Sequence, residues 1–306
     1  MNTFIKNNNL LISNNSTATS NSQYFILNEN EWVKANHYDP TIAGYYFYAT
    51  RTNTAPTRVT ANSIGDGSAG SVGNFANFNN GAIWNGATGN VTTVGTNGGP
   101  SYYGIFDGGG NVNEWTDGLV STDTRRVRGG NYATTGAPNI GFAVLRTITN
   151  RGADVGFRVG SYTNTLNLPN FVNIGDINNP SYDKGYGSVG YNYSVCSFQL
   201  TNNEYVDFLN SVAGSPYADT YQLYSTLMTS NVRGGIFRYG SAGSYNYSVK
   251  TNMGNKPVNY VSYLSAIRYC NWLTNGKPVG PQNLTTTEDG TYYINGATFD
   301  YFPRKT

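Results

Sequence analysis

A chain of 306 residues is long enough to bury a sizeable core without disulfides or metals, as one large domain or two ordinary ones. Aromatic residues make up 14% of it, with 26 Tyr, and this content excludes intrinsic disorder. Only 12% of the residues are charged, and 19 basic against 17 acidic side chains give a net charge of +2. That is too little positive charge to bind nucleic acid through its phosphates.

The first residues of the chain differ from those that follow. Residues 1–22 are rich in Asn, Ser and Thr, and we expect a flexible or strand-exchanging arm. The apolar run Leu10–Ile12 is too short for the core of a signal peptide. No stretch approaches the roughly 18 consecutive apolar residues of a membrane span. The sequence therefore predicts neither a secretory signal nor membrane insertion.

A short helix is expected between Tyr24 and Tyr38. Asn28 is a suitable N-cap and Glu31, three residues later, completes the pattern of a capping box. From Gly44 to Gly110 the chain instead reads as loops and short strands separated by Gly, Asn and Thr. A segment this long and irregular needs something to hold it in place, and bound ions are one possibility.

The second part of the chain begins after residues 163–173, which have the composition of a linker. Val189–Leu200 alternates as a strand does, and Asn202–Val212 has the apolar spacing of an amphipathic helix. A further helix is expected from the N-cap Ser262 to Leu273, ended by an Asn-Gly pair. Three short helices among many short strands and long loops predict an α+β protein.

The cysteine and histidine content excludes several kinds of site. Cys196 and Cys270 are too few and too far apart for a disulfide framework, a redox pair or a zinc knuckle. The single histidine, His37, cannot form a two-histidine iron site, and a Ser-His-Asp relay is not recognisable around it. We expect both cysteines to pack in the core and His37 to lie at the surface or in a loop.

Three motifs in the first part of the chain carry a family resemblance. They are Gly110–Asp117 (GNVNEWTD), Arg128–Tyr132 (RGGNY) and Gly156–Arg158 (GFR). In this order they resemble the GNVWEWT, RGGSW and GFR motifs that close the domain of the formylglycine-generating enzyme, or sulfatase-modifying-factor, family. Asn113 stands where the family prefers Trp, which would loosen or reshape the turn.

Other segments resemble the same family but in a different order. Phe25–Trp32 looks like its RLPTEAEW helix, Val195–Asn210 like its opening strand and helix, and Lys256–Leu273 like its CNWL helix. The family places the last two segments first, so the chain resembles a circular permutant. Residues 23–162 would be the C-terminal half of the family domain and residues 174–306 its N-terminal half, with 163–173 as the connection. An alternative is that the halves pair between chains of a homo-oligomer.

The resemblance implies a C-type-lectin-like α+β fold but not the family's oxidase chemistry. The enzymes bind copper through two cysteines after the RGGSW motif, and here those positions are Thr134 and Asn139. Neither residue offers a thiolate, so we expect no copper. The three-histidine iron site of the related sulfoxide synthases would need more histidines than this chain has. No catalytic residue is therefore assigned.

Calcium is the cofactor that the resemblance still implies. The family site would be formed by Asp107, the carbonyls of Gly110 and Val112, and Glu114. A second site would fall at Asn77 and the Phe78 carbonyl. The alternative is a hydrogen-bonded turn in which Glu114 accepts backbone N–H groups.

Four further motif residues are expected to belong to the scaffold rather than to a binding site. They are Trp115, Arg128, Arg146 and Arg158, and the arginines would cross-link loop backbones.

The sequence as a whole favours a non-catalytic structural or recognition protein. Asn, Gly, Ser and Tyr loops make adaptable contacts, which suits a virion component (fibre, tail or capsid accessory) or a module at an extracellular surface. The expected partners are other protein subunits, including copies in a homo-oligomer, or a surface receptor or glycan. One alternative is a metal-dependent oxidase or another enzyme with a non-standard site. The other is a calcium-dependent glycan-binding module, although the Glu-Pro-Asn tripeptide that chelates sugars is absent.

Overall fold

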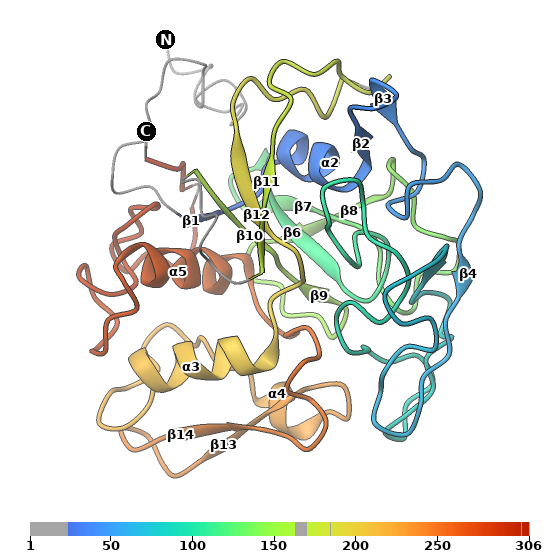
Figure 1. The fold of residues 1–306 in the computed structure, drawn as a ribbon. Coiled ribbons are helices and arrows are strands. Elements are labelled where there is room, and N and C mark those ends of the chain that lie inside the picture. The colour runs from blue at the N-terminus through green and yellow to red at the C-terminus, as the bar shows by residue number, and fades with distance from the viewer. Residues whose placement is uncertain (1–23, 163–169, 184, 301, 306) are drawn as a thin grey trace.

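The computed structural model describes residues 24–162, 170–183, 185–300 and 302–305, so the predicted arm at 1–22 lies outside them. The protein is mixed α+β, with few helices, short strands and long loops (Figure 1). The helices are α2 (Glu29–His37), α3 (Asn202–Val212), α4 (Thr226–Ser230) and α5 (Tyr263–Thr274). Within the described ranges, no helix is both long enough and apolar enough to cross a bilayer.

Two four-stranded sheets form the centre of the fold. The first has the order β1-β10-β12-β11 and is antiparallel throughout; the second has the order β8-β7-β6-β9, with β6 and β9 parallel. The strands of the first are β1 (Tyr24–Ile26), β10 (Val159–Ser161), β12 (Tyr193–Cys196) and β11 (Phe171–Ile174). Those of the second are β8 (Ala143–Thr147), β7 (Thr124–Arg128), β6 (Asn113–Ser121) and β9 (Val155–Gly156).

Three two-stranded ladders lie outside these sheets. They are β2 (Tyr38–Asp39) with β3 (Gly44–Tyr45), β4 (Thr57–Arg58) with β5 (Phe75–Ala76), and β13 (Ile236–Tyr239) with β14 (Asn246–Val249).

The first sheet joins parts of the chain that are far apart in sequence. Phe25 of β1 pairs with Gly160 of β10, and Gly160 pairs with Val195 of β12. Val172 of β11 pairs with Val195 from the other side. In this single chain, therefore, residues 23–162 and residues 174–306 contribute strands to one sheet.

The helix starts follow from their capping residues. The capping box predicted for α2 is confirmed, because the Asn28 side chain accepts from Glu31 N at 2.9 Å and Glu31 accepts from Asn28 N at 2.7 Å. Ser262 caps α5 as expected, with its Oγ accepting from Ser265 N at 3.1 Å. Thr201 and Glu204 make a second capping box before α3.

The structure corrects three expectations about secondary structure. Part of the predicted linker 163–173 is ordered as β11 against β12, while residues 163–169 lie outside the described ranges. The predicted strand Val189–Leu200 is regular only over Tyr193–Cys196. A fourth helix, α4, was not predicted, because its five residues are too few for a periodic apolar pattern.

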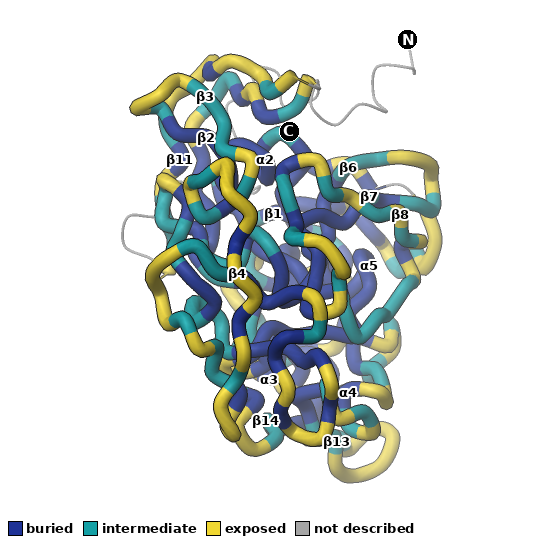
Figure 2. The backbone as a smooth tube through the Cα atoms, turned by 90° about the vertical axis from the view of Figure 1, so that its right-hand side faces the viewer, coloured by how far each residue is buried: buried dark blue, intermediate teal, exposed yellow. Residues whose placement is uncertain are grey.

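Aromatic rings of α3 and α5 form a large part of the core. The Phe208 ring lies 5.2 Å from that of Tyr269 and 5.3 Å from that of Trp272, centroid to centroid. Tyr205 reaches the GFR motif, with its ring centroid 6.5 Å from that of Phe157. In Figure 2 the buried residues occupy the middle of the molecule, while the exposed residues lie in the outer loops, including those around β4.

Residues near the end of the described chain close one edge of β1. Thr291 Oγ1 donates to Tyr24 O at 2.6 Å, and the Arg304 guanidinium donates to Ile26 O. Arg304 also forms ion pairs with Glu31 at 2.9 Å and with Asp117 at 3.2 Å. This buried cluster ties residues 291–304 to the start of the first sheet.

Candidate functional site

The loop before β6 contains the residues predicted to bind calcium. Its backbone enters the left-handed region at Asp107 (φ 57°), Gly110 (φ 103°) and Asn111 (φ 65°). At Gly110 a Cβ atom would stand 2.3 Å from the Asn77 carbonyl oxygen, so only glycine fits there. The bend turns the carbonyl groups of the loop toward one point.

Four oxygens of this loop surround the side-chain nitrogen of Gln199. Gln199 Nε2 lies 3.0 Å from Val112 O and 3.1 Å from Glu114 Oε1. It lies 3.2 Å from Asp107 O and 3.4 Å from Gly110 O. An amide nitrogen carries two hydrogens and cannot satisfy four acceptors, and Gln199 Oε1 is buried with no partner in the described structure. We call these four oxygens and the Gln199 amide the oxygen cluster.

The oxygen cluster has the composition of a calcium site. Calcium binds six to eight oxygens, of which carbonyls and carboxylates are typical. The cluster offers three carbonyls and one carboxylate, and Gln199 would add its unpartnered Oε1 if its amide were turned over. Among the described residues no group of three His, Cys, Asp or Glu side chains could hold a metal, so any ion here would rest mainly on carbonyl oxygens.

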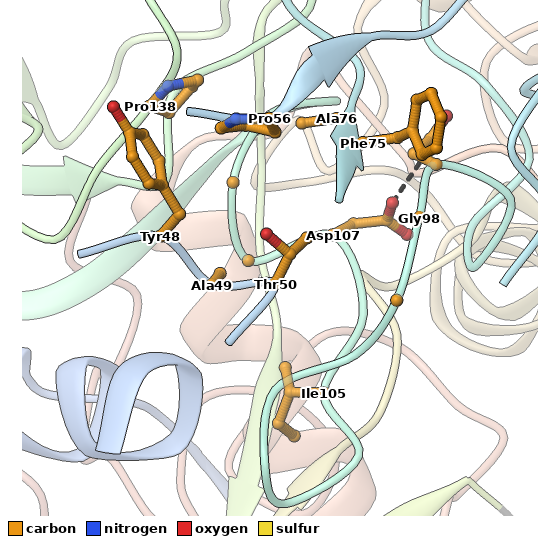
Figure 3. Close-up of a pocket in the computed structure, with 14 residues that line it drawn as sticks. Tyr48, Ala49, Thr50, Pro56, Phe75, Ala76, Gly98, Ile105, Asp107 and Pro138 are labelled. Atoms are coloured by element: carbon orange, nitrogen blue, oxygen red, sulfur yellow. Dashed lines mark hydrogen bonds between the residues drawn. The ribbon is translucent and has the colours of Figure 1, made fainter. Parts of the chain in front are cut away.

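Asp107 joins the oxygen cluster through its main chain instead of its carboxylate, contrary to the sequence prediction. Its Oδ2 accepts from Gly95 N and its Oδ1 from Asn97 Nδ2, both at 2.7 Å. Figure 3 shows the carboxylate directed toward the Gly98 segment. Burial raises the pKa of this carboxyl group, although both hydrogen bonds favour the charged form. The adjoining cavity, about 10 Å³, has room for no more than a water molecule.

Glu114 is held by side chains, so the expectation that it accepts backbone N–H groups is wrong. Trp32 Nε1 donates to its Oε2 at 2.8 Å, and Arg158 binds both carboxylate oxygens, at 2.8 and 3.1 Å. The ion pair is almost fully buried, with 1% of each side chain exposed.

The expectation that Arg158 cross-links loop backbones is confirmed. Its guanidinium donates to Phe106 O at 2.7 Å and to Cys196 O at 2.9 Å. Arg158 therefore joins the loop before β6 to the end of β12 and is part of the scaffold.

Trp115 and Arg128 also have internal partners. Trp115 Nε1 donates to Val261 O at 3.0 Å. Arg128 binds Glu29 with its Nε at 2.8 Å and donates to Ile140 O at 3.1 Å.

Arg146 and Asn113 meet at Asp154. Arg146, which is partly exposed, forms an ion pair with Asp154 at 2.9 Å, and Asn113 Nδ2 donates to the same carboxylate at 3.2 Å. Asn113 also pairs with Val155 of β9, so the residue that replaces the family's Trp holds a regular place in the sheet.

Both residues of the second predicted calcium pair form hydrogen bonds with neighbouring segments. Asn77 Nδ2 donates to Asn90 O at 2.9 Å and to Thr92 Oγ1 at 3.0 Å, while Asn77 Oδ1 is buried without a partner. The Phe78 carbonyl accepts from Gly81 N at 3.1 Å within a turn. Asn77 instead supports the first site, because its carbonyl accepts from Asn111 N at 2.9 Å.

The two positions that hold catalytic cysteines in the family stabilise local turns here. Thr134 Oγ1 accepts from Asn131 N at 2.9 Å, and Asn139 Oδ1 accepts from Gly141 N at 2.9 Å. These are short-range side-chain caps typical of Thr and Asn.

The two cysteines are buried and free, as expected. Burial raises the pKa of Cys196 to about 12 and that of Cys270 well above its usual value. Such thiols are poor nucleophiles because the thiolate form is suppressed.

The expectation that His37 lies at the surface or in a loop is wrong, because it is buried as the last residue of α2. Burial lowers its pKa to about 3, helped by the charge of Arg128. No local pattern indicates this, because α2 mixes the apolar Trp32, Val33 and Ala35 with polar residues and buries both kinds.

Sequence reasoning missed Gln199, the residue at the centre of the oxygen cluster. It lies between β12 and the capping residue of α3, about 90 residues from the loop it contacts.

Comparison of the chain with protein-family models, curated proteins and solved structures finds no match.

Proposed function

We propose that this chain is a non-catalytic structural or recognition protein built on a circularly permuted domain like that of the formylglycine-generating enzyme family. The observation that carries the proposal is that the motif side chains are engaged inside the scaffold. Glu114 and Arg158 bind each other, and Trp115 and Arg128 bond to neighbouring segments. These contacts support a scaffold role for the motif side chains.

The absence of a reactive thiol at the family's catalytic positions supports the same proposal. Thr134 and Asn139 cap turns, and the two cysteines are buried elsewhere. A copper site would need thiolates that these positions do not supply. The expected rate of oxygen consumption with a thiol peptide is therefore that of the buffer.

Exposed apolar side chains in the long loops favour contact with other proteins. Ile42, Ile64, Val72 and Ile83 have between 46% and 68% of their surface exposed. They lie in the weakly charged residues 42–83, which include β4, and β4 faces the viewer in Figure 2. We propose that these loops bind other subunits, copies of the chain included, or a surface receptor, in a virion or at an extracellular surface.

The experiment that tests this proposal has two parts. Sedimentation and electron microscopy of the native protein should find an oligomer or an ordered assembly, and antibodies against the chain should label intact particles or cell surfaces. A monomer that consumes oxygen in the presence of a thiol peptide would refute the proposal.

We further propose that the oxygen cluster can hold a structural calcium ion. The Asp107, Gly110 and Val112 carbonyls, Glu114 and the turned amide of Gln199 would be its ligands. The ion would neutralise the carbonyl dipoles that converge there and fix the loop before β6. This role involves no catalytic step.

Glu114→Gln is the variant that tests the ion. Calcium should raise the melting temperature of the dialysed wild-type protein and leave that of Glu114→Gln unchanged. The readout is the difference between the melting temperatures in calcium and in chelator, because the substitution also weakens the ion pair with Arg158. The exposed Asp183→Asn should respond like the wild type. If the dialysed protein contains no calcium and added calcium does not change its melting temperature, the calcium proposal is wrong and the Gln199 amide alone occupies the oxygen cluster.

A further inference from the structure

One cleft of the protein is lined by none of the residues that carry the family resemblance. It is an open cleft of about 470 Å³ between residues 218–226 and the β13–β14 hairpin. This is within the usual size of small-ligand sites, about 300–1,000 Å³. Two arginines, Arg151 and Arg238, line it.

Arg238 is held in a fixed orientation by two tyrosine rings. Its guanidinium carbon lies 4.4 Å from the centroid of Tyr224 and 4.1 Å from that of Tyr245. Rings on its faces leave the N–H edge of the guanidinium for hydrogen bonds, and this edge can meet a ligand beside its hydrogen bond with Tyr247. That edge matches the two oxygens of a carboxylate.

The charge of the cleft is not neutralised within the described structure. No carboxylate of the described residues forms an ion pair with Arg151 or Arg238. Asp219 also lines the cleft, but it accepts from Leu223 N at 2.7 Å and from Tyr224 N at 3.0 Å. Two arginines and one aspartate leave a net charge of about +1, which suits a monoanion better than a phosphate dianion.

The remaining lining indicates what the anion is attached to. Gln222, Ser225 and Thr226 supply amide and hydroxyl groups, and Tyr245 supplies an aromatic wall. Such a lining can bind a small molecule that carries several hydroxyl groups.

We propose that this cleft binds an acidic sugar residue, with the sugar carboxylate on the edge of Arg238 and the ring beside Tyr245. The proposal deepens the recognition role proposed above and rests on it, since it names a glycan carrying a carboxylate as the partner. It does not depend on the calcium ion or on the state of assembly.

Calorimetric or NMR titration of the full chain tests the cleft. Glucuronic acid or N-acetylneuraminic acid should bind in the millimolar range or tighter, and glucose at least tenfold more weakly. N-acetylalanine, which has a carboxylate without sugar hydroxyls, and inorganic phosphate should also bind at least fivefold more weakly than the acidic sugars. Equal binding of glucose, or tighter binding of N-acetylalanine or phosphate, would overturn the proposal.

Variants separate a binding role from a structural one. Arg238→Met should weaken acidic-sugar binding at least tenfold, and Arg238→Lys, which keeps the charge but loses the planar fork, at least fivefold. The control Arg58→Met, at an exposed arginine outside the cleft, should bind as the wild type does. Retained affinity in both Arg238 variants would refute the assignment. The oligomeric state of these variants should be unchanged. This measurement separates a failure of the glycan site from a failure of the proposed structural role.

Discussion

Two arginines show how differently the same side chain is used in two regions of this molecule. Arg158 is buried, paired with Glu114, and bonded to carbonyls of two further segments. Arg238 is half-buried between two tyrosine rings and, within the described ranges, has no ion-pair partner. The first environment uses the guanidinium to hold loops together, whereas the second gives it one hydrogen bond, with Tyr247, and places it in the wall of an open cleft.

The largest effect should come from breaking the Arg158 pair. Arg158→Met leaves the Glu114 carboxylate buried without its counter-charge, which typically costs about 3–5 kcal/mol. Urea unfolding should show this loss in the free energy of unfolding. The double variant Glu114→Leu with Arg158→Met should recover part of it, because no unpaired charge remains. A loss below about 1 kcal/mol in the single variant would mean that the pair does not hold the loops.

A smaller effect should follow from acidification, through His37. The pKa of His37 is about 3 in the folded protein, because burial disfavours the charged ring. The unfolded chain binds its proton below about pH 6.5, so stability is full above that pH and falls as the pH drops toward 3. The free energy of unfolding should fall by about 2 kcal/mol between pH 6.5 and pH 5.

The chain offers a direct control for this pH dependence. His37 is its single histidine, so a His37→Asn variant should lose this fall in stability between pH 6.5 and pH 5, whatever its absolute stability. A profile as steep as that of the wild type would assign the titration to another group.

The smallest change in stability should come from Arg238. A half-exposed cation stacked on tyrosine contributes no more than about 1 kcal/mol. Arg238→Met should therefore unfold at nearly the same urea concentration as the wild type while losing the ligand. If it is destabilised as much as Arg158→Met, the contrast between scaffold and binding arginine fails.

The sequence predicted the parts of the fold that depend on local signals. The capping box at Asn28 and the N-cap at Ser262 follow from residues three positions apart, and the structure contains both. The strand β11 was misjudged as linker because what makes Phe171–Ile174 a strand is its pairing with β12, which no local pattern reveals.

The candidate site could be predicted only in part, for a related reason. A sequence motif places Gly110, Val112 and Glu114 near one another, since they lie within five consecutive residues. It does not show that Asp107 turns its carboxylate toward Gly95 and Asn97. Gln199 and Arg238 have no motif at all, and they become meaningful only through side chains that folding brings to them.

The closure of β1 bears on how the protein is made. The hydrogen bond between Thr291 and Tyr24 joins residues 267 positions apart, and Arg304 reaches back to Glu31. A ribosome that has released β1 must therefore add more than 130 residues before its strand partner β10 exists, and more than 260 before Thr291 does. Non-local pairing of this kind slows folding, to between milliseconds and seconds even in small β-rich domains. Until β10 has been synthesised, β1 needs protection from pairing with other chains.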